Sequence, residues 1–182
     1  MPTIVFANPK GGAGKSTSAV LLATQFAENG AFVTILDADP NKPISYWSKR
    51  GQKPEKITVI ADISEATVID EIDVAASNTP FVIVDLEGTA SMMVAYAISR
   101  ADLVIIPVQG SQLDAQEAGK AIKLIRQQEK AFSKRIPFAI LLTRTNPAVR
   151  ARTLSHIQAE FSKHNIRLFK TEVHEREAYR AL

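Results

Sequence analysis

Residues 9–17 read Pro-Lys-Gly-Gly-Ala-Gly-Lys-Ser-Thr, and they lie between an apolar run and a helical pattern. The run before them, Thr3–Ala7, is short and continuously apolar, as expected of a strand buried on both faces. After them, Ser16–Phe26 is typical of a helix. A strand, a glycine-rich loop and a helix in this order indicate a phosphate site, because the loop N–H groups and the positive end of the helix dipole face the anion.

The residue types within this loop suit a nucleotide phosphate and its metal ion. Glycines allow a tight bend with the N–H groups pointing inward, and we expect this of Gly11, Gly12 and Gly14. Lys15 is expected to reach the β- and γ-phosphates, and the Ser16 hydroxyl is expected to ligate Mg²⁺. The predicted nucleotide-binding residues of the loop are Lys10, Gly11, Gly12, Ala13, Gly14, Lys15, Ser16 and Thr17.

Strand and helix patterns alternate along the rest of the chain. The expected strands are Thr3–Asn8, Phe32–Asp37, Phe81–Leu86, Leu103–Pro107 and Phe138–Thr143, with a weaker candidate at Ile57–Ala61. The expected helices are Lys15–Glu28, Glu65–Ala76, Ser91–Ser99, Gln112–Phe132 and Ala148–His164. This alternation predicts an α/β fold with three layers, in which a mostly parallel, twisted sheet carries helices on both faces. A length of 182 residues with 46% hydrophobic content fits one domain over residues 1–182, and the helical pattern at the chain's end leaves a further C-terminal tail open.

Carboxylates follow two of the expected strands. Asp37 and Asp39 come after the second strand, where they could serve a hydrated Mg²⁺ and an attacking water, although this segment also suits a polar turn. Phe81–Asp85 is an apolar run that ends in aspartate, the Walker B pattern, and such a carboxylate holds Mg²⁺, usually through water. The N–H of Gly88 could contact the γ-phosphate, and the role of Glu87 stays open.

Composition limits the classes of function. The absence of cysteine excludes disulfides, thiolate metal sites and a cluster-bearing reductase. No apolar run approaches the length of a transmembrane helix, so we expect a cytoplasmic protein without a membrane partner. Residues 1–119 hold 8 Lys/Arg and 14 Asp/Glu, whereas residues 120–182 hold 14 and 5, so the net charge of +3 divides into −6 and +9. This asymmetry favours an anionic partner for the C-terminal part.

The glycine-rich loop departs from the general P-loop pattern at two positions, since Pro9 replaces the usual first glycine and Lys10 is a second lysine. The string Lys10–Thr17 resembles the deviant Walker A ATPases, which include ParA-type partition proteins and MinD. The segments around residues 32–47 and 81–114 resemble the small, ParF-like subgroup. The resemblance implies the P-loop NTPase fold, slow ATP hydrolysis with Mg²⁺, and an ATP-dependent sandwich homodimer in which Lys10 contacts the partner's phosphates.

The same resemblance implies roles for individual residues. In such ATPases an aspartate like Asp39 orients the hydrolytic water, and Asp37 would support the metal ion and the loop. The implied catalytic residues are Lys10, Lys15 and Asp39, and the implied metal ligands are Ser16, Asp37 and Asp85. The resemblance also implies a centromere-binding partner, ParB-like or of the ribbon-helix-helix type, that stimulates hydrolysis during plasmid or chromosome segregation.

The base of the nucleotide is expected to be adenine. GTPases recognise guanine with Asn/Thr-Lys-x-Asp after a later strand, and the corresponding stretch here, Leu142–Pro147, lacks that aspartate. By resemblance, Arg144 and Asn146 lie where the family contacts the base, although a simple strand-end loop explains them equally well.

Basic residues gather in the C-terminal part of the chain. Lysines and arginines spread over one surface suit non-specific DNA, because they contact phosphates without reading bases, but scattered charges also occur simply as solvated helix faces. The residues expected to contact DNA are Arg150, Arg152, Lys163, Arg167 and Lys170. Together with the family resemblance, they predict association with the bacterial nucleoid.

Other uses of the same ATPase stay open. A MinD-like membrane or cell-pole positioner would need a C-terminal amphipathic helix, and Arg176–Leu182 is too short and poorly segregated to form one. A DNA-transfer (conjugation) accessory ATPase would bind a specific DNA element. A metabolic ligase on the same fold would turn over ATP with a carboxylic acid substrate, independently of DNA.

Overall fold

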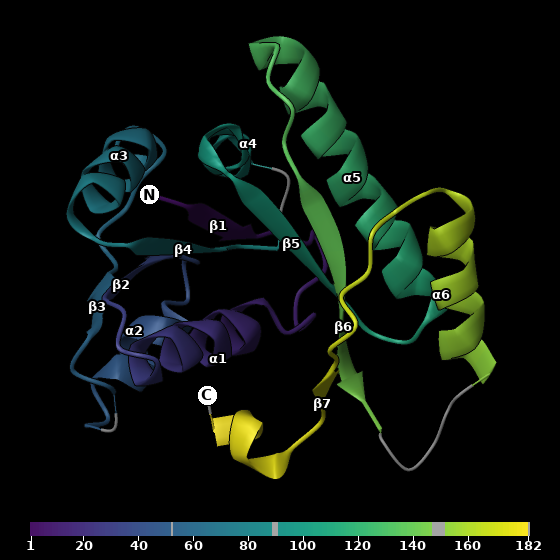
Figure 1. Ribbon diagram of the computed structural model, residues 1–182, viewed down its shortest axis with the longest axis horizontal. Coiled ribbons are helices and arrows are strands. Elements are labelled where there is room, and N and C mark those ends of the chain that lie inside the picture. The colour runs from purple at the N-terminus through teal and green to yellow at the C-terminus, as the bar shows by residue number, and fades with distance from the viewer. Residues whose placement is uncertain (52, 89–90, 147–151, 182) are drawn as a thin grey trace.

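The computed structural model describes residues 1–51, 53–88, 91–146 and 152–181 (Figure 1). Within them the strands are β1 (Thr3–Phe6), β2 (Val33–Ala38), β3 (Ile57–Ile60), β4 (Phe81–Leu86), β5 (Leu103–Val108), β6 (Phe138–Thr145) and β7 (Val173–His174). The helices are α1 (Lys15–Glu28), α2 (Pro43–Ser48), α3 (Val68–Asn78), α4 (Met92–Arg100), α5 (Gln112–Phe132) and α6 (Arg152–Lys163), followed by a 3₁₀ turn at Glu177–Ala181.

These strands run parallel in one sheet, in the order β3-β2-β4-β1-β5-β6-β7. The loop after β1 therefore leaves from the middle of the sheet's carboxyl edge, between β4 and β5. In the register, Asp37 of β2 is opposite Asp85 of β4, and Asp85 is opposite Phe6 of β1. Two carboxylates and the start of the glycine-rich loop thus meet at one point of that edge, where ligands of parallel sheets bind.

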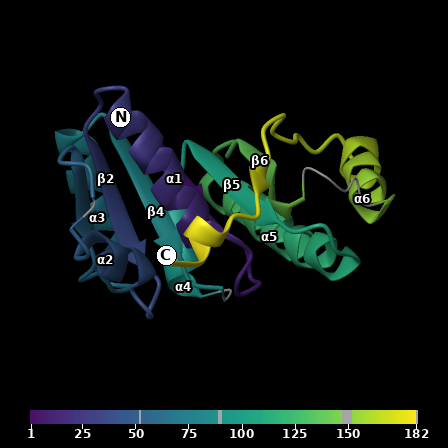
Figure 2. The same cartoon turned by 90° about the horizontal axis from the view of Figure 1, so that it is seen from below.

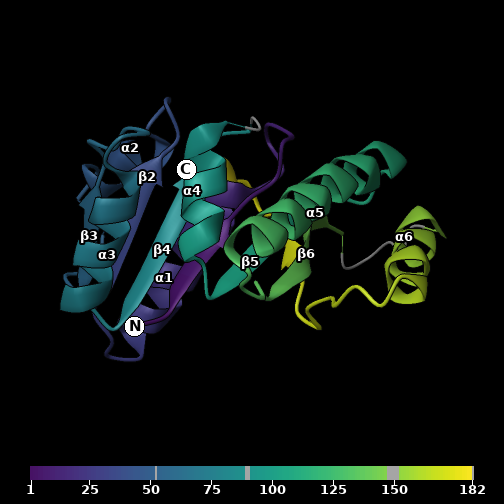
Figure 3. The same cartoon turned by 90° about the horizontal axis from the view of Figure 1, so that it is seen from above.

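Helices cover both faces of the sheet, as Figures 2 and 3 show from opposite sides. On one face, α1 and α2 bury Ala19, Ala23 and Ile44 against the strands. On the other face lie α3, α4 and α5, and α6 lies beyond α5 (Figure 3). Because alanine side chains are short, α1 approaches the strands closely, and this packing fixes its first turn beside the strand ends.

The predicted α/β architecture is confirmed. The expected helices Lys15–Glu28 and Gln112–Phe132 match α1 and α5. The sequence pattern does not predict β7, because two residues are too few for an alternation to show. The helix α2 was implied only by the likeness around residues 32–47, since six residues cover less than two helical turns. The expected start of the last helix at Ala148 lies outside the described residues.

The third helix begins later than predicted. Its expected first residue was Glu65, whereas α3 starts at Val68. The reason is a turn in front of it, in which the Ser64 backbone N–H donates to the Thr67 hydroxyl at 3.1 Å and the Thr67 N–H donates to the Ser64 carbonyl at 3.2 Å.

Among the described residues, no helix is both long and apolar enough to cross a bilayer.

Candidate nucleotide and metal site

The loop between β1 and α1 has a backbone that requires glycine at two positions. Gly12 and Gly14 have φ angles of 71° and 92°, in the left-handed region that side chains disfavour. A Cβ on Gly14 would also lie 3.4 Å from the Thr143 side chain, at the limit of ordinary contact. Gly12 and Gly14 therefore have backbone conformations that favour glycine, whereas Gly11 has an ordinary conformation and room for a side chain.

Two neighbouring strands tie this loop to the sheet. The Thr143 hydroxyl of β6 donates to the Ala13 carbonyl at 2.8 Å. The Gln109 amide, one residue beyond β5, donates to the Gly12 carbonyl at 2.6 Å. The loop is thus held at the carboxyl ends of β5 and β6, and no local pattern in the sequence indicated either contact.

Lys15 is the first residue of α1, and its ammonium lies within the loop. The residue is 6% exposed, and its Nζ donates to the carbonyls of Asn8 at 3.2 Å and Lys10 at 3.3 Å. Burial lowers the pKa of Lys15, while the carboxylates of Asp85 and Asp39 oppose that change. An anion bound in this loop would supply the negative counter-charge that the buried ammonium lacks.

Asp37 and Asp85 are fully buried beside each other, and three of their four carboxylate oxygens have no hydrogen-bond partner. The fourth, Oδ2 of Asp37, accepts from the Ser45 N–H at 2.7 Å. Burial raises the pKa of Asp85 to about 7, with a further contribution from Asp37, and the nearby Ser16 hydroxyl opposes the shift. Burial also raises the pKa of Asp37. Unpaired buried carboxylates are costly, and a cation nearby would relieve that cost.

The donor set fits a hydrated Mg²⁺ better than a cage made of protein ligands. Among the described residues, no group of three or more His, Asp or Glu side chains could hold a metal ion by itself. A hard cation here would need the Ser16 hydroxyl, phosphate oxygens and water to complete its coordination. Such a partly hydrated site is typical of Mg²⁺ bound beside a nucleotide.

A cavity of about 380 Å³ opens where the loops after β1, β2 and β4 meet. Of the predicted site residues, its lining includes Gly11, Gly12, Gly14, Lys15, Ser16, Thr17 and Asp39. Ala13 is buried and is absent from this lining. Asp37 and Asp85 do not line the cavity either, so they would contact a metal ion at Ser16 through water. Asp39 is half-exposed, and its Oδ1 accepts from the Asn41 N–H at 2.8 Å and from the Asn41 side-chain amide at 3.0 Å.

Lys10, the second lysine of the loop, pairs with a carboxylate of its own chain. Its Nζ lies 2.6 Å from Oδ1 of Asp114, in the first turn of α5. Asp114 is 1% exposed, and its other oxygen accepts from the hydroxyl of Ser111, the residue that caps α5. In this single chain Lys10 is therefore bound in cis. Asp114 belongs to the stretch around residues 81–114 that resembles the ParF-like subgroup, but the sequence did not indicate its contact with Lys10, because 104 residues separate the two.

The two predicted base contacts lie near the loop but outside the phosphate cavity. Arg144 is exposed near the end of β6, with a φ of 52°, at the point where the β6–β7 pairing is irregular. Asn146 follows β6 directly. Neither residue lines the cavity of about 380 Å³. Their role in binding a base stays a prediction.

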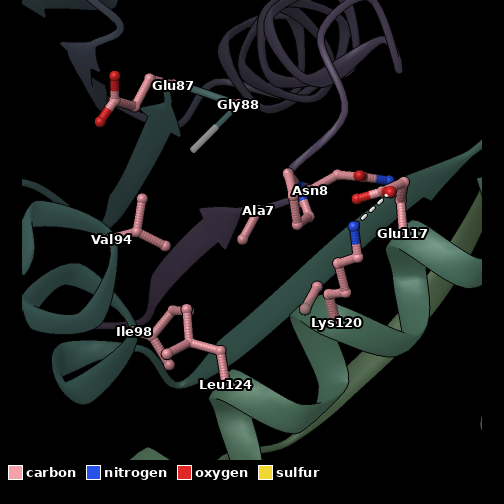
Figure 4. A pocket seen from close by; sticks show the side chains of 11 residues that line it. Ala7, Asn8, Glu87, Gly88, Val94, Ile98, Glu117, Lys120 and Leu124 are labelled. Carbon is pink, nitrogen blue, oxygen red and sulfur yellow. Dashed lines mark hydrogen bonds and ion pairs between the residues drawn. The ribbon is translucent and has the colours of Figure 1, made fainter. Parts of the chain in front are cut away.

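The loop after β4 packs tightly on the glycine-rich loop. A Cβ on Gly88 would lie 2.9 Å from the Pro9 carbonyl oxygen and 3.1 Å from the Gly11 nitrogen, so only glycine fits there without a shift. A second, more apolar cavity of about 360 Å³ adjoins this contact between α4 and α5 (Figure 4). It is lined by Ala7, Val94, Ile98 and Leu124 among others, with Glu87 and Gly88 at one end.

The predicted DNA contacts are only partly described. Arg150 lies outside the described residues, and Arg152 is the first residue of α6. Lys163 pairs with Glu160 of the same helix at 3.4 Å. Arg167 and Lys170 are exposed on the segment that follows α6.

Comparison with known proteins is consistent with this geometry. The model of the VirC1 protein family matches residues 1–182. A protein named ParA from Rhizobium radiobacter is 41% identical over 182 residues, which are 100% of this chain and 82% of that protein. The maintenance of carboxysome distribution protein A of Halothiobacillus neapolitanus is 28% identical over 180 residues, 98% of this chain and 82% of that protein.

Solved structures share the fold at low sequence identity. Apo McdA from Cyanothece has a TM-score of 0.84 at 16% identity, over 100% of this chain and 88% of that chain. A plasmid partition protein from Borrelia burgdorferi has a TM-score of 0.77 at 18% identity, over 97% and 91%. Cobyrinic acid a,c-diamide synthase from Mycobacterium smegmatis, with bound ATP analogue and magnesium, has a TM-score of 0.81 at 15% identity, over 100% and 92%.

Proposed function

Because the chain belongs to the VirC1 family and to the ParA-type partition and positioning ATPases, we propose that it is an ATP-driven DNA segregation switch. ATP and Mg²⁺ would bind at the glycine-rich loop, and the loaded chain would form a homodimer that binds non-specific DNA. Hydrolysis would then dissolve the dimer and release the DNA. A ParB-like or ribbon-helix-helix centromere-binding protein would stimulate that step, and plasmid or chromosome segregation at the nucleoid would follow.

One observation carries the nucleotide part of this proposal. At the centre of the carboxyl edge, the loop cavity, the Lys15 ammonium and the unpaired oxygens of Asp37 and Asp85 converge. Positive charge on one side and buried unpaired carboxylates on the other suit a phosphate bridged to a cation. When bound, Mg²⁺ would neutralise charge that develops on the phosphates.

The residues of the chain would then have separate roles in phosphate binding, metal ligation and water positioning. Lys15 would turn from the two loop carbonyls that it contacts now and bind phosphate oxygens. Ser16 would ligate the metal ion, with Asp85 and Asp37 behind it. Asp39 lines the same cavity and is half-exposed, so its carboxylate can hold a water molecule for in-line attack.

The dimer would depend on Lys10. Each triphosphate carries more negative charge than one loop neutralises, and a lysine from a second copy would add a cation at that point. For this, Lys10 must leave Asp114, whose carboxylate now lies 2.6 Å away. The Lys10 side chain is 36% exposed, so it can move without unpacking the core, and the phosphates of a bound triphosphate would offer it more negative charge than the single carboxylate of Asp114.

Sedimentation with and without nucleotide tests the proposal. Wild type should be a monomer with ADP and a dimer with ATP and Mg²⁺, and Lys10→Ala should stay monomeric with ATP. The control, Lys49→Ala, removes an exposed lysine outside the site and should dimerise normally. An unchanged ATP dimer in Lys10→Ala, or an absence of ATP-dependent dimers in wild type, would contradict the proposal.

The cargo has a second candidate, because one relative is named for the distribution of carboxysomes, a cargo other than DNA. A protein that positions such a cargo would still cycle between ATP dimer and monomer. Growth assays of plasmid retention distinguish the two uses. Loss of the gene should raise plasmid loss if the cargo is DNA, and should leave plasmid retention unchanged if it is not.

A further inference from the structure

A basic pocket lies at the edge of the molecule remote from the glycine-rich loop. It has a volume of about 330 Å³ and forms where the end of α5, the start of β6 and the segment after α6 meet. Three arginines line it, Arg126, Arg135 and Arg167, and we call it the arginine pocket. The glycine-rich loop contacts the opposite, carboxyl end of β6 through Thr143, so the arginine pocket is separate from the nucleotide site.

One wall of the arginine pocket is held in place by bonds within the chain. Arg126 donates to Oε2 of Glu129 at 2.7 Å, and Oε1 of Glu129 accepts from the Ile136 N–H at 2.9 Å. The Arg126 guanidinium also lies 5.1 Å from the centre of the Phe138 ring. The Ile136 N–H and Arg126 keep the pKa of Glu129 below its ordinary value, so this carboxylate is ionised at neutral pH and offsets the charge of Arg126.

The other two arginines are more open to a partner outside the chain, although Arg135 lies near enough to Glu129 to contribute to the lowered pKa of that carboxyl. Arg135 precedes β6 and Arg167 follows α6, and both side chains are exposed. Among the described residues, no ion pair within 4 Å includes either of them. Three arginines and one glutamate leave the pocket with a net charge of +2, within the half of the sequence that carries +9.

We propose that the arginine pocket receives a phosphate of the DNA backbone, which Arg135 and Arg167 contact from two sides. This inference rests on the proposed function and names the place where the DNA binds. Guanidinium groups match phosphate oxygens in a bidentate way, and a concave pocket admits one projecting phosphate. Contacts to phosphate alone carry no sequence information, which agrees with non-specific binding.

The shape of the pocket favours DNA over an anionic membrane. A protein that lies on a membrane inserts protruding apolar side chains beside its basic residues. Here the charged groups line a hollow, and the partly buried Phe138 ring lies 5.1 Å from the Arg126 guanidinium. Two exposed phenylalanines, Phe132 and Phe169, are outside the lining, and lipid vesicles in the test below show whether they bind a membrane. Arg167 was among the residues expected to contact DNA, whereas Arg135 is added by the tertiary structure.

The test compares two double variants that lose the same charge. Arg135→Gln/Arg167→Gln empties the pocket of its unpaired cations, and Lys49→Gln/Lys123→Gln removes two exposed lysines outside its lining. Binding of a fluorescent 40-base-pair duplex is measured with ATP and Mg²⁺ over a range of salt concentrations. Basal ATP hydrolysis without DNA should be unchanged in both variants, which shows that they are folded.

The pocket variant should bind DNA at least tenfold more weakly than wild type. The slope of log affinity against log salt should fall by about one for each arginine lost, whereas the control variant should change much less. Equal affinity and slope in the two variants would contradict a DNA contact at the arginine pocket but would leave DNA binding by the dimer as proposed. No DNA binding by wild type with ATP would overturn the proposed function itself. Loss of binding to phosphatidylserine vesicles, with DNA binding unchanged, would assign the pocket to a membrane and also overturn the proposal.

Discussion

At the residue scale, the buried pair Asp37 and Asp85 is an unfavourable feature of the free protein. Both carboxyl groups are inaccessible to solvent, and three oxygens lack partners. Such an arrangement costs free energy in the absence of a cation, because burial removes both carboxyl groups from solvent and the Ser45 N–H and the Ser16 hydroxyl offset only part of that loss. Ligand sites commonly carry a local cost of this kind, which binding then relieves.

Asp85→Asn should make the nucleotide-free protein more stable, and increasingly so as pH rises. The pKa of Asp85 is about 7 in the folded chain against an ordinary 3.8. The folded state therefore binds more protons than the unfolded state between these values, and its stability falls as pH rises through this window. Between pH 5 and pH 8 the advantage of the variant should grow by about 2–3 kcal/mol.

Urea unfolding without Mg²⁺ or nucleotide at the two pH values measures this difference. Asp62→Asn, at an exposed carboxyl, serves as the control and should show little pH-dependent change relative to wild type. A constant stability difference between Asp85→Asn and wild type at pH 5 and pH 8 would contradict the raised pKa.

The ion pair between Lys10 and Asp114 makes a second prediction at this scale. Asp114→Asn keeps a polar side chain beside Ser111 but removes the carboxylate that holds Lys10. Because Lys10 then starts free of a buried carboxylate, ATP-dependent dimerisation should become at least about fivefold stronger per protomer, equivalent to about 1 kcal/mol or more. Sedimentation against protein concentration gives the dimer constant. Glu117→Gln, which breaks the Lys120 pair on the same helix, should leave it unchanged, and a weaker dimer in Asp114→Asn would refute the idea.

At the element scale, the packing of one loop on another links the end of β4 to the nucleotide site. The loop after β4 approaches the loop after β1 so closely that no side chain fits at Gly88. A side chain added at position 88 would therefore displace one of the two loops at this contact. This contact also adjoins the apolar cavity between α4 and α5.

Two glycine substitutions separate this contact from the general effect of adding a methyl group. Gly88→Ala places a Cβ 2.9 Å from the Pro9 carbonyl oxygen, so it should displace the loop, lower stability by about 1–3 kcal/mol and reduce ATP hydrolysis at least tenfold. Gly119→Ala lies in α5 with open space around it and should stabilise the chain by about 0.5–1 kcal/mol. Thermal unfolding and phosphate-release assays measure both effects. Normal ATP hydrolysis in Gly88→Ala would show that the contact is dispensable.

At the scale of the whole molecule, charge is divided between two functions. The first 119 residues carry −6 and hold the buried carboxylates, whereas residues 120–182 carry +9 and supply the arginine pocket. The nucleotide and the proposed DNA contacts therefore use opposite ends of the strands. A dimer formed at the nucleotide site would present two copies of the basic surface.

DNA binding should accordingly depend on the nucleotide. A dimer neutralises about twice as many phosphates as a monomer, so the slope of log affinity against log salt should be about twice as steep with ATP as with ADP. Fluorescence anisotropy on the same duplex gives both slopes. Equal slopes in the two nucleotide states would mean that dimerisation does not add phosphate contacts.

The sequence predicts much of this molecule because several of its signals are local. Short apolar runs buried on both faces mark the strands, and the glycines and lysines of residues 9–17 mark the loop by chain order alone. The alternation of strands and helices then predicts parallel pairing. Carboxylates at strand ends, such as Asp39 and Asp85, could thus be assigned to one edge of the sheet from the sequence alone.

Contacts between distant parts of the chain could be decided only by the tertiary structure. Asp114 lies 104 residues from Lys10, and Thr143 lies 130 residues from Ala13, so no periodicity connects them. Arg135 and Arg167 belong to different elements, and only the folding of β6 beside the segment after α6 brings them to one pocket. Local chemistry determined the elements and the loop, because backbone preferences act over a few residues. Charge pairing and burial depend on which residues are neighbours in space, and the chain brings those residues together only when the helices pack on the sheet.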